Sequence, residues 1–445
     1  MLDFNLKHYK FRQEGGPVNA ADTAWVLVST ALVLLMTPAL AFFYGGLVRA
    51  KNALNTMMMS LVSLGCVGVA WFLLGYTLAF GPGTLVLGDL SSALLRGVGL
   101  DCAPGSTIPR LLFMAYQGTF AIITAALISG AVVERMKFLA YAVFITLWSL
   151  VVYGTVAHWV WGGGWLARMG ALDFAGGTVV HITAATAALV AATLLGPRKD
   201  YARQAILPHN VPFTILGAGL LWFGWFGFNG GSALAVNGQA VLAFVNTLAA
   251  PAATLLVWMG LDLARSGKAT AAGGATGIVV GLVAITPAAG YVSPASALLI
   301  GALAAVPSHF AILWRTRTRL DDSLDVVAAH GLGGTVGALL TGVFADRAWG
   351  APVNGLLYGN PRQFLVQCLA VLATVAFTAL VTFALLKLVA VFAALKATPA
   401  EEGQGLDFSQ HGEEAYASGD GALLLLPDAR TRVEISLLPT EGAVH

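Results

Sequence analysis

The chain has 445 residues, of which 58% are hydrophobic and only 10% are charged. A soluble domain carries about 25% charged residues, so this composition excludes a soluble globular protein and indicates one embedded in a membrane. The formal net charge of +2 gives no indication of nucleic-acid binding. The three cysteines, Cys66, Cys102 and Cys368, lack metal-ligand spacing, and no disulfide framework is expected.

Apolar segments of about 20 residues, the length of a helix that crosses a bilayer, follow one another along the chain. Residues 1–20 contain basic side chains but no apolar core, so no signal peptide is expected there. Eleven transmembrane helices are predicted, near residues 23–47, 54–81, 109–133, 138–160, 176–195, 211–229, 240–264, 273–286, 291–314, 326–344 and 363–395. The eighth is short, and its ends are poorly marked. The predicted fold class is an all-α polytopic membrane protein.

Basic residues predict the orientation, because cytoplasmic loops are enriched in Lys and Arg. The loops after odd-numbered spans carry twelve: Arg49, Lys51, Arg135, Lys137, Arg198, Lys199, Arg203, Arg265, Lys268, Arg315, Arg317 and Arg319. The loops after even-numbered spans carry five: Arg96, Arg110, Arg168, Arg347 and Arg362. The N-terminus is therefore expected outside and the C-terminus inside. Residues 1–397 form the predicted membrane domain, and residues 398–445 form a cytoplasmic tail.

Two histidines, His181 and His330, lie inside the fifth and the tenth apolar spans. An imidazole in hydrocarbon is costly and rare, so each of them is a candidate functional residue. Small residues follow each histidine at positions i+3, i+4 and i+7, and such a helix face lets another backbone come close. They are Ala184, Ala185 and Ala188 in the fifth span, and Gly333, Gly334 and Gly337 in the tenth.

The numbering of these two spans predicts two five-helix halves followed by a final long helix. Because each half has an odd number of spans, the halves have opposite orientation, as in transporters whose sites lie between inverted repeats. Asp173 is expected to cap the outer end of the fifth span, about 12 Å above His181. Asp325, near the inner end of the tenth span, puts His330 about 8 Å from the other side. The two imidazoles are therefore expected to meet near mid-bilayer.

Other interpretations of the histidines are weaker. A satisfied hydrogen bond between helices explains one membrane histidine, but it explains two matching ones less well. A zinc pair lacks a third ligand with suitable spacing, so no metal or cofactor is expected. His158, beside tryptophans at a span end, is interpreted as interfacial, and His309 as a packing or polar-contact residue.

Several segments closely resemble the ammonium transporter (Amt/Mep/Rh) family, in its bacterial Amt form. They are FYGGLVRAKN (43–52), YQGTFAIITAALISGAVVERMKF (116–138), HWVWGGGW (158–165), DFAGGTVVH (173–181), GWFGFNGGS (224–232), FVNT (244–247) and DDSLDVVAAHG (321–331). The resemblance extends from about residue 20 to 416, and DFAGGTVVH is its most specific part. It implies a homotrimer in the cell membrane, in which each protomer has its own eleven-helix pore for ammonium-derived nitrogen.

The resemblance also implies roles for residues at the outer vestibule. Trp161 and Phe120 supply aromatic faces to the ammonium cation, Ser232 supplies a hydroxyl, and Phe120 and Phe228 form a stacked gate. This fits the chemistry, because aromatic rings attract cations, whereas a bare charge crosses an apolar channel at high cost. Without the resemblance, Trp161 would be interpreted as a membrane-interface anchor and the phenylalanines as core or lipid-facing. Tyr116 departs from the expected phenylalanine and adds a hydroxyl near the entrance.

His181 and His330 are expected to share a hydrogen bond and to hold at most one proton in excess, because a dry site and mutual repulsion disfavour two charges. This suits a mechanism in which ammonium loses its proton at the gate, ammonia passes, and the proton follows along the histidines, which makes uptake electrogenic. Passive leakage of ammonia is the competing mechanism, and the sequence leaves both open. Asp173 is assigned a structural role, ordering its loop through backbone N–H bonds, rather than a binding role.

After Ala397 the composition becomes polar. Residues 405–416, GLDFSQHGEEAY, resemble the family's cytoplasmic tail, which implies contact with the neighbouring protomer and with PII-type regulatory proteins. For residues 417–445 two interpretations remain, a short strand or docking segment and a solvated tail. A transporter is favoured over an ammonium sensor of the same fold that signals through its tail. An intramembrane enzyme is disfavoured, because no nucleophile or metal triad accompanies the histidines.

Overall fold

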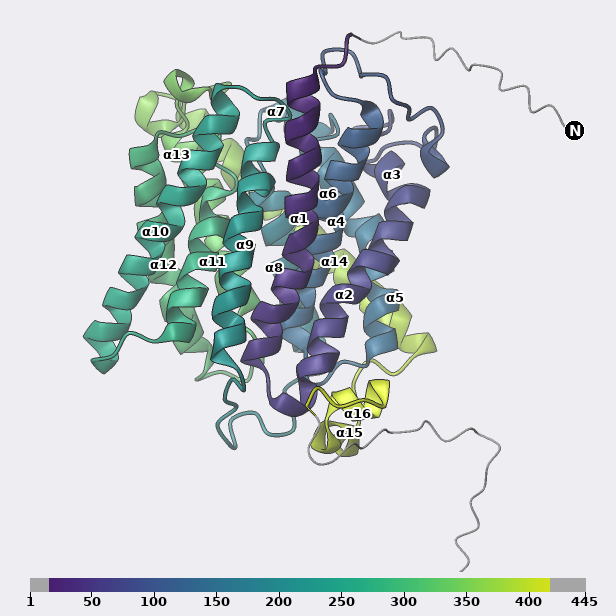
Figure 1. Cartoon of the computed structure of the whole chain (residues 1–445), viewed down its shortest axis with the longest axis vertical. Helices are drawn as coiled ribbons and strands as arrows, with labels where there is room; N and C mark the ends of the chain where they lie inside the picture. Colours follow the sequence, from purple (N-terminus) through teal and green to yellow (C-terminus); the bar gives the residue numbers. More distant parts are fainter. Residues whose placement is uncertain (1–15, 417–445) are drawn as a thin grey trace, which may run out of the picture.

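The computed structural model describes residues 16–416, which form a bundle of helices (Figure 1); the predictions for residues 1–15 and 417–445 lie outside them. Ten helical segments of this described part are long and apolar enough to cross a membrane. They are α1 (Ala20–Leu47), the segment of α2 and α3 (Ala50–Phe80), α4 (Arg110–Val132), the segment of α5 to α7 (Phe138–Met169), the segment ending in α8 (Gly177–Leu195), α9 (Val211–Gly231), α10 (Gly238–Ser266), α12 (Pro294–Arg315), the segment ending in α13 (Val327–Phe344) and α14 (Pro361–Phe392). Residues 16–416 contain isolated β-bridges but no strand. The prediction of an all-α polytopic membrane protein is confirmed.

The predicted eighth span corresponds to α11 (Ala271–Ile285), which has only 15 residues. It begins after Thr270, whose side chain accepts a hydrogen bond from the backbone N–H of Gly273 and so caps the helix. Residues 279–285 are all buried. A helix shorter than the bilayer is tolerated where protein covers the chain that follows it, so α11 completes the predicted set of eleven.

The two ends of the bundle are distinguished by what they carry. α1 begins at one end, called here the N-terminal end, where the Asn19 side chain accepts hydrogen bonds from the backbone N–H groups of Ala21 and Asp22. The short helices α15 (Pro399–Gln404) and α16 (Leu406–His411) pack at the opposite end, called here the tail end (Figure 1).

Glycines bring α9 into close contact with α1, which runs beside it through the bundle (Figure 1). A Cβ atom on Gly217 would lie 2.3 Å from the backbone nitrogen of Phe43, and one on Gly227 would lie 2.6 Å from Cβ of Leu32. No larger residue fits at either position, so the two backbones approach as small-residue stripes allow. This contact fixes the last turn of α9, which carries Phe228.

The glycine stripe predicted after His330 packs in the same way. A Cβ atom on Gly337 would lie 2.2 Å from the carbonyl oxygen of Ala284 at the end of α11, and one on Gly334 would lie 3.0 Å from Cβ of His181. The predicted close helix contact at this stripe is therefore confirmed. It brings the two histidine-bearing spans side by side.

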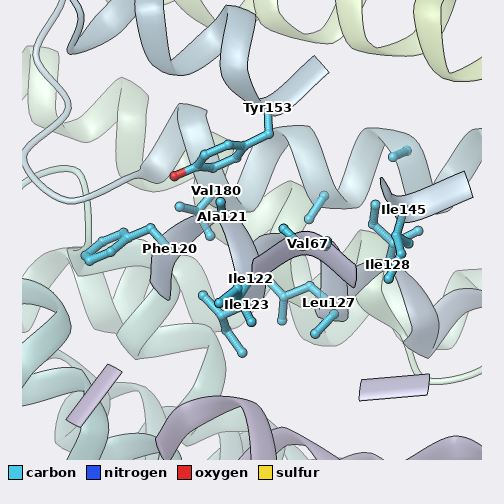
Figure 2. Close-up of a cluster of buried hydrophobic side chains, with 14 of the residues drawn as sticks. Val67, Phe120, Ala121, Ile122, Ile123, Leu127, Ile128, Ile145, Tyr153 and Val180 are labelled. Atoms are coloured by element: carbon cyan, nitrogen blue, oxygen red, sulfur yellow. The ribbon is translucent and has the colours of Figure 1, made fainter. Parts of the chain in front are cut away.

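Apolar side chains hold α4 in the interior. Figure 2 shows side chains of α4 packed with Val67 of α2 (Ala53–Ala70), Ile145 of α5 (Phe138–Trp148) and Val180. Phe120 lies at one end of this cluster (Figure 2). Buried side chains packed at crystal-like density move little on the time average. The packing of α4 therefore fixes the position of Phe120.

Buried ion pairs hold the tail end together. Glu134, which is fully buried, pairs with Arg49 at 3.0 Å and with Arg198 at 2.6 Å, and Arg198 pairs with Asp321 at 2.7 Å. Buried charges are tolerated when they are paired and hydrogen-bonded. These residues follow α1, α4, α8 (Thr183–Leu195) and α12, so the network joins four connections.

The start of the tail docks on the first turn of α2. The Asp407 carboxylate accepts hydrogen bonds from the backbone N–H groups of Leu54 (3.0 Å) and Asn55 (2.7 Å), which makes it a helix cap supplied by a distant segment. Nδ2 of Asn55 lies 3.0 Å from Nε2 of His411, whose ring packs edge-on against Phe138. The tail helices are therefore part of the packed structure.

Candidate functional site

The two intramembrane histidines face each other inside the bundle. Nδ1 of His181 lies 3.3 Å from Nδ1 of His330, and the ring centroids are 5.3 Å apart. Both side chains are buried, with 1% and 3% of their surface exposed. At this distance one Nδ1 carries a proton and donates it to the other.

Each histidine lies in a π-helical turn at the start of its span. His181 belongs to η5 (Gly177–Ile182) and His330 to η6 (Val327–Leu332), and regular α-helix follows in α8 and in α13 (Gly333–Phe344). Isolated π-helical turns are rare and occur frequently at functional sites. The two halves of the chain therefore build their histidines into matching local structures.

An aspartate caps each of these turns, eight residues before the histidine in both spans. In the tenth span this residue is Asp322, whose carboxylate accepts from the backbone N–H groups of Val326 (3.1 Å) and Val327 (2.7 Å). Asp325 lies directly before the first helical residue, as expected for the inner end, and its carbonyl accepts from the N–H of Ala329 (2.9 Å), but its side chain pairs with Arg315 and does not cap the helix. Helical structure begins at residue 177 and at residue 326, so each histidine lies four residues, about 6 Å, into its helix.

Asp173 caps the fifth span with both of its carboxylate oxygens. Oδ1 accepts from the N–H groups of Gly176 (2.8 Å) and Gly177 (2.6 Å), and Oδ2 accepts from those of Thr178 (2.8 Å) and Val179 (3.2 Å) and from the Thr178 hydroxyl. Gly176 has a φ of 119°, which lets the chain curl around the carboxylate. Five donors occupy the two oxygens, which supports a structural role for this residue.

Two residues that sequence reasoning missed orient His181. The Thr286 hydroxyl lies 2.8 Å from the Leu282 carbonyl and accepts from Nε1 of Trp225 (2.9 Å); when its proton goes to that carbonyl, its remaining lone pair favours a hydrogen on Nε2 of His181, 3.4 Å away. With its proton on Nε2, His181 accepts at Nδ1 from Nδ1–H of His330. Nε2 of His330 is left with a free lone pair. Many threonines here bond back to their own helix, so nothing in the sequence singled out Thr286.

Phe120 and Phe228 pack against each other beside the histidine pair. Their ring centroids are 4.2 Å apart at an angle of 32°, and each ring is only 1% exposed. The Phe228 ring is in turn stacked with the His181 ring, with centroids 6.0 Å apart and planes 20° apart. The structure therefore brings both phenylalanines next to the histidine pair.

Trp161 and Ser232 lie beside this aromatic pair. The rings of Trp161 and Phe120 meet edge-on with centroids 6.1 Å apart, and Nε1 of Trp161 donates to the Asp173 carbonyl at 2.9 Å. Ser232 follows the last residue of α9, and its hydroxyl donates to the Phe228 carbonyl at 2.8 Å. The carboxyl end of a helix carries a partial negative charge, so this position favours a cation.

Two separate cavities lie near the histidine pair and toward the tail end. A narrow one of about 10 Å³ adjoins both histidines, and it is large enough for about one water-sized molecule. A wider one of about 310 Å³ shares α1 and α11 with the narrow one, but it is otherwise lined by α10, α12 and the connections around residues 206–208 and 323–325. The successive lining residues are Phe43 and Leu47 on α1, Val279 and Thr276 on α11, and His330 and Asp325 around the tenth span.

The other histidines have different surroundings. The interpretation of His158 as interfacial was wrong: its side chain is 2% exposed, and its two ring nitrogens lie 3.0 Å from the Ala79 carbonyl and 2.9 Å from the Thr84 carbonyl. It orders the 79–84 connection. His309 makes a polar contact, as predicted, with Nε2 3.1 Å from Asp262. No group of three His, Cys, Asp or Glu side chains suited to a metal ion occurs among residues 16–416.

Comparisons with known proteins agree in a single family. The model of the Ammonium Transporter Family matches residues 24–416. The chain is 48% identical over 400 residues to an ammonium transporter of Bacillus subtilis (strain 168), covering 89% of this chain and 98% of the relative. The crystal structure of Mep2 from Candida albicans has a TM-score of 0.82 at 36% identity and covers 86% of this chain and 88% of its own. A structure described as "Sensor Amt Protein" has a TM-score of 0.81 at 29% identity, with coverages of 88% and 98%.

Proposed function

The chain belongs to the ammonium transporter family, and we propose from this premise that it binds ammonium beside Trp161, removes a proton, and conducts ammonia past His181 and His330. The observation that carries the proposal is the contact of 3.3 Å between the two Nδ1 atoms. Two polar ring edges in an otherwise apolar passage can form hydrogen bonds with ammonia, a small neutral molecule. Neither imidazole needs to carry a full charge to do so.

The binding step takes place at the N-terminal end, which is the outer side in the proposed orientation. Edges and faces of Trp161 and Phe120 attract the cation, and Ser232 offers hydroxyl lone pairs. The carboxyl end of α9 adds a partial negative charge at the same position. Together these groups offset part of the free energy that ammonium loses when its hydration shell is removed.

The gate and the narrow cavity select the neutral species. With ring centroids 4.2 Å apart, Phe120 and Phe228 leave no opening, so one ring must rotate to admit each molecule. Beyond them, room for about one water-sized molecule forbids a hydration shell. An unsolvated cation in such surroundings costs many kcal/mol, whereas ammonia carries no charge to solvate.

The histidine pair carries the proton. Ammonium gives up H⁺ and becomes ammonia, which accepts or donates single hydrogen bonds along the histidine edges. The proton passes separately along the pair: one imidazole accepts H⁺ at Nε2, an Nδ1–H shifts across the shared bond, and the other imidazole releases H⁺ from its own Nε2. The released proton rejoins ammonia on the tail side, and the two rings, left in the opposite tautomers, return to their starting forms before the next cycle. One positive charge crosses with each ammonia, so uptake is electrogenic.

A current measurement tests this proposal. Purified protein in liposomes receives a step in ammonium concentration on a solid-supported membrane, and we expect a transient inward current that protein-free liposomes lack. Passive leakage of ammonia predicts alkalinisation of the lumen without charge movement. Luminal pH changes with no current would therefore refute the proton relay.

Membership of the family supports a proposal for the wider assembly. We assign the protein to the cell membrane with the tail end facing the cytoplasm, as a homotrimer of protomers that each hold one pore. The packed α15 and α16 give a PII-type regulatory protein a structured surface on that side.

An ammonium sensor of the same fold is the second candidate. It is supported by the likeness to the structure described as a sensor and by the docking of the tail on α2. Growth of a strain that lacks its own ammonium carriers separates the two. A transporter restores growth on low ammonium, and a sensor without transport does not.

A further inference from the structure

Tyr116, where the resemblance led us to expect phenylalanine, stands one helical turn before Phe120 on α4. Residues four apart share a helix face, and the two rings meet at 5.0 Å between centroids. The Tyr116 side chain is fully buried. Its hydroxyl therefore needs a hydrogen-bond partner inside the protein.

The partners of this hydroxyl lie across the passage on α9. Its single proton is shared between the carbonyls of Gly227 (2.9 Å) and Phe228 (3.0 Å), as a bifurcated hydrogen bond. The bond thus runs from the helix that carries one gate phenylalanine to the backbone of the other. Without the hydroxyl, only apolar contacts would hold α4 and α9 at their present distance beside Phe120 and Phe228.

The Phe228 carbonyl lacks its regular helical hydrogen bond and therefore depends on side-chain donors. At the end of α9 the N–H of Ser232 turns to the Asn229 carbonyl (3.2 Å), so it does not close the regular bond to Phe228. The carbonyl accepts hydrogen bonds instead from the hydroxyls of Ser232 (2.8 Å) and Tyr116. With its single proton committed there, the Ser232 oxygen has only lone pairs left for an arriving N–H donor.

The space around the hydroxyl is shaped to hold it. Its oxygen lies 3.3 Å from Oγ of Ser232. A Cβ atom on Gly231 would lie 2.6 Å from the Tyr116 oxygen and 2.5 Å from Cβ of Ser29, so only glycine leaves room for the hydroxyl here. The slot is formed by three helices, α1, α4 and α9.

We propose that the Tyr116 hydroxyl is a positioning group for the ammonium site, which fixes the distance between Phe120 and Phe228 and keeps the Ser232 oxygen turned toward the cation. The hydroxyl acts through the Phe228 carbonyl and Ser232. This inference rests on the proposed function of the site. It adds a determinant of selectivity among small cations, because a looser gate admits larger ones.

The test is Tyr116→Phe, which removes the hydroxyl and keeps the ring. Ammonium-evoked currents in liposomes give the apparent KM and the maximal current, and methylammonium-evoked currents give the discrimination between the two cations. We expect the KM for ammonium to rise about fivefold, the factor that corresponds to one net hydrogen bond. The ratio of methylammonium to ammonium current should rise as well. In a Ser232→Ala background the same exchange should have a smaller effect, because both hydroxyls act on one carbonyl.

Tyr141→Phe is the matched control. The Tyr141 hydroxyl is equally buried and donates to the Ala125 carbonyl of the same helix α4 (3.2 Å), away from the gate. Its loss should leave the KM and the current ratio unchanged. Equal KM values and ratios in the two variants would overturn the inference, and so would a Tyr116→Phe protein that fails to assemble while Tyr141→Phe assembles. Absence of any ammonium-evoked flux in the unmodified protein would overturn the proposed function together with it.

Discussion

Replacing Asp173 with Asn tests whether this carboxylate serves the fold or the substrate. Asn has the same shape, but its amide NH2 group takes the place of one carboxylate oxygen. Each oxygen of Asp173 accepts two backbone N–H bonds, so either orientation of the amide leaves two buried N–H groups facing another donor.

The size of the effect follows from that count. A buried donor without a partner costs about 1–3 kcal/mol, so two of them cost about 2–6 kcal/mol. Folded proteins are stable by only about 5–15 kcal/mol. We therefore expect Asp173→Asn to lower the yield of assembled protein and its melting temperature in detergent strongly.

Asp322→Asn provides an internal comparison. Asp322 caps the equivalent turn of the other half, but each of its oxygens accepts only one backbone N–H group. The same exchange should therefore cost about half as much, about 1–3 kcal/mol. Melting curves followed by intrinsic fluorescence, together with uptake per assembled molecule, measure both variants on one scale. An Asp173→Asn protein that assembles and melts like the unmodified one but has lost uptake would refute the structural role.

Two further predictions concern the pore and the tail. His330→Glu puts a carboxylate where the free Nε2 lone pair now lies, and the attraction of cations to it should reduce the ratio of ammonium to potassium current about tenfold; an unchanged ratio in liposomes would count against a selective histidine pair. Burial lowers the pKa of the His411 imidazole below its usual range. The docked tail therefore holds the neutral ring, and docking should be complete above about pH 6.5, the ordinary histidine value, and should weaken as the pH falls below it. Hydrogen exchange of residues 406–411 at pH 7.5 and 6.0 measures this, and His411→Gln should abolish the difference; protection that stays constant in the unmodified protein would contradict it.

Much of the fold could be predicted because the bilayer imposes strict demands on a chain. Every backbone polar group in hydrocarbon must bond within its own segment, so spanning helices are apolar and about 20 residues long. That signal located the spans, including the short eighth one at α11. A histidine in such a span is conspicuous for the same reason, and both His181 and His330 were identified before their contact was known.

The connections between helices were less accessible. Asp325 was correctly placed near the inner end of the tenth span, but the capping role of Asp322 was not foreseen, because the turn at Asp325 (φ 59°) decides which carboxylate reaches the N–H groups at the helix start. Thr286 and Trp225 carry no local mark of their role, since a threonine in an apolar helix usually bonds to its own backbone. Likewise, the departure at Tyr116 was noticed, but the acceptors of its hydroxyl were not.

The sequence by itself determined the membrane class, the helical spans and the two intramembrane histidines, because each of these depends on the identity of nearby residues along one helix. Only the tertiary structure decided which hydroxyl faces Nε2 of His181 and which carbonyls accept from the Tyr116 hydroxyl, since Thr286 and Gly227 lie 105 and 111 positions away in the chain. A hydrogen bond depends on distance and angle to within a few tenths of an ångström. Such precision arises from the packing of whole helices, which no local pattern records.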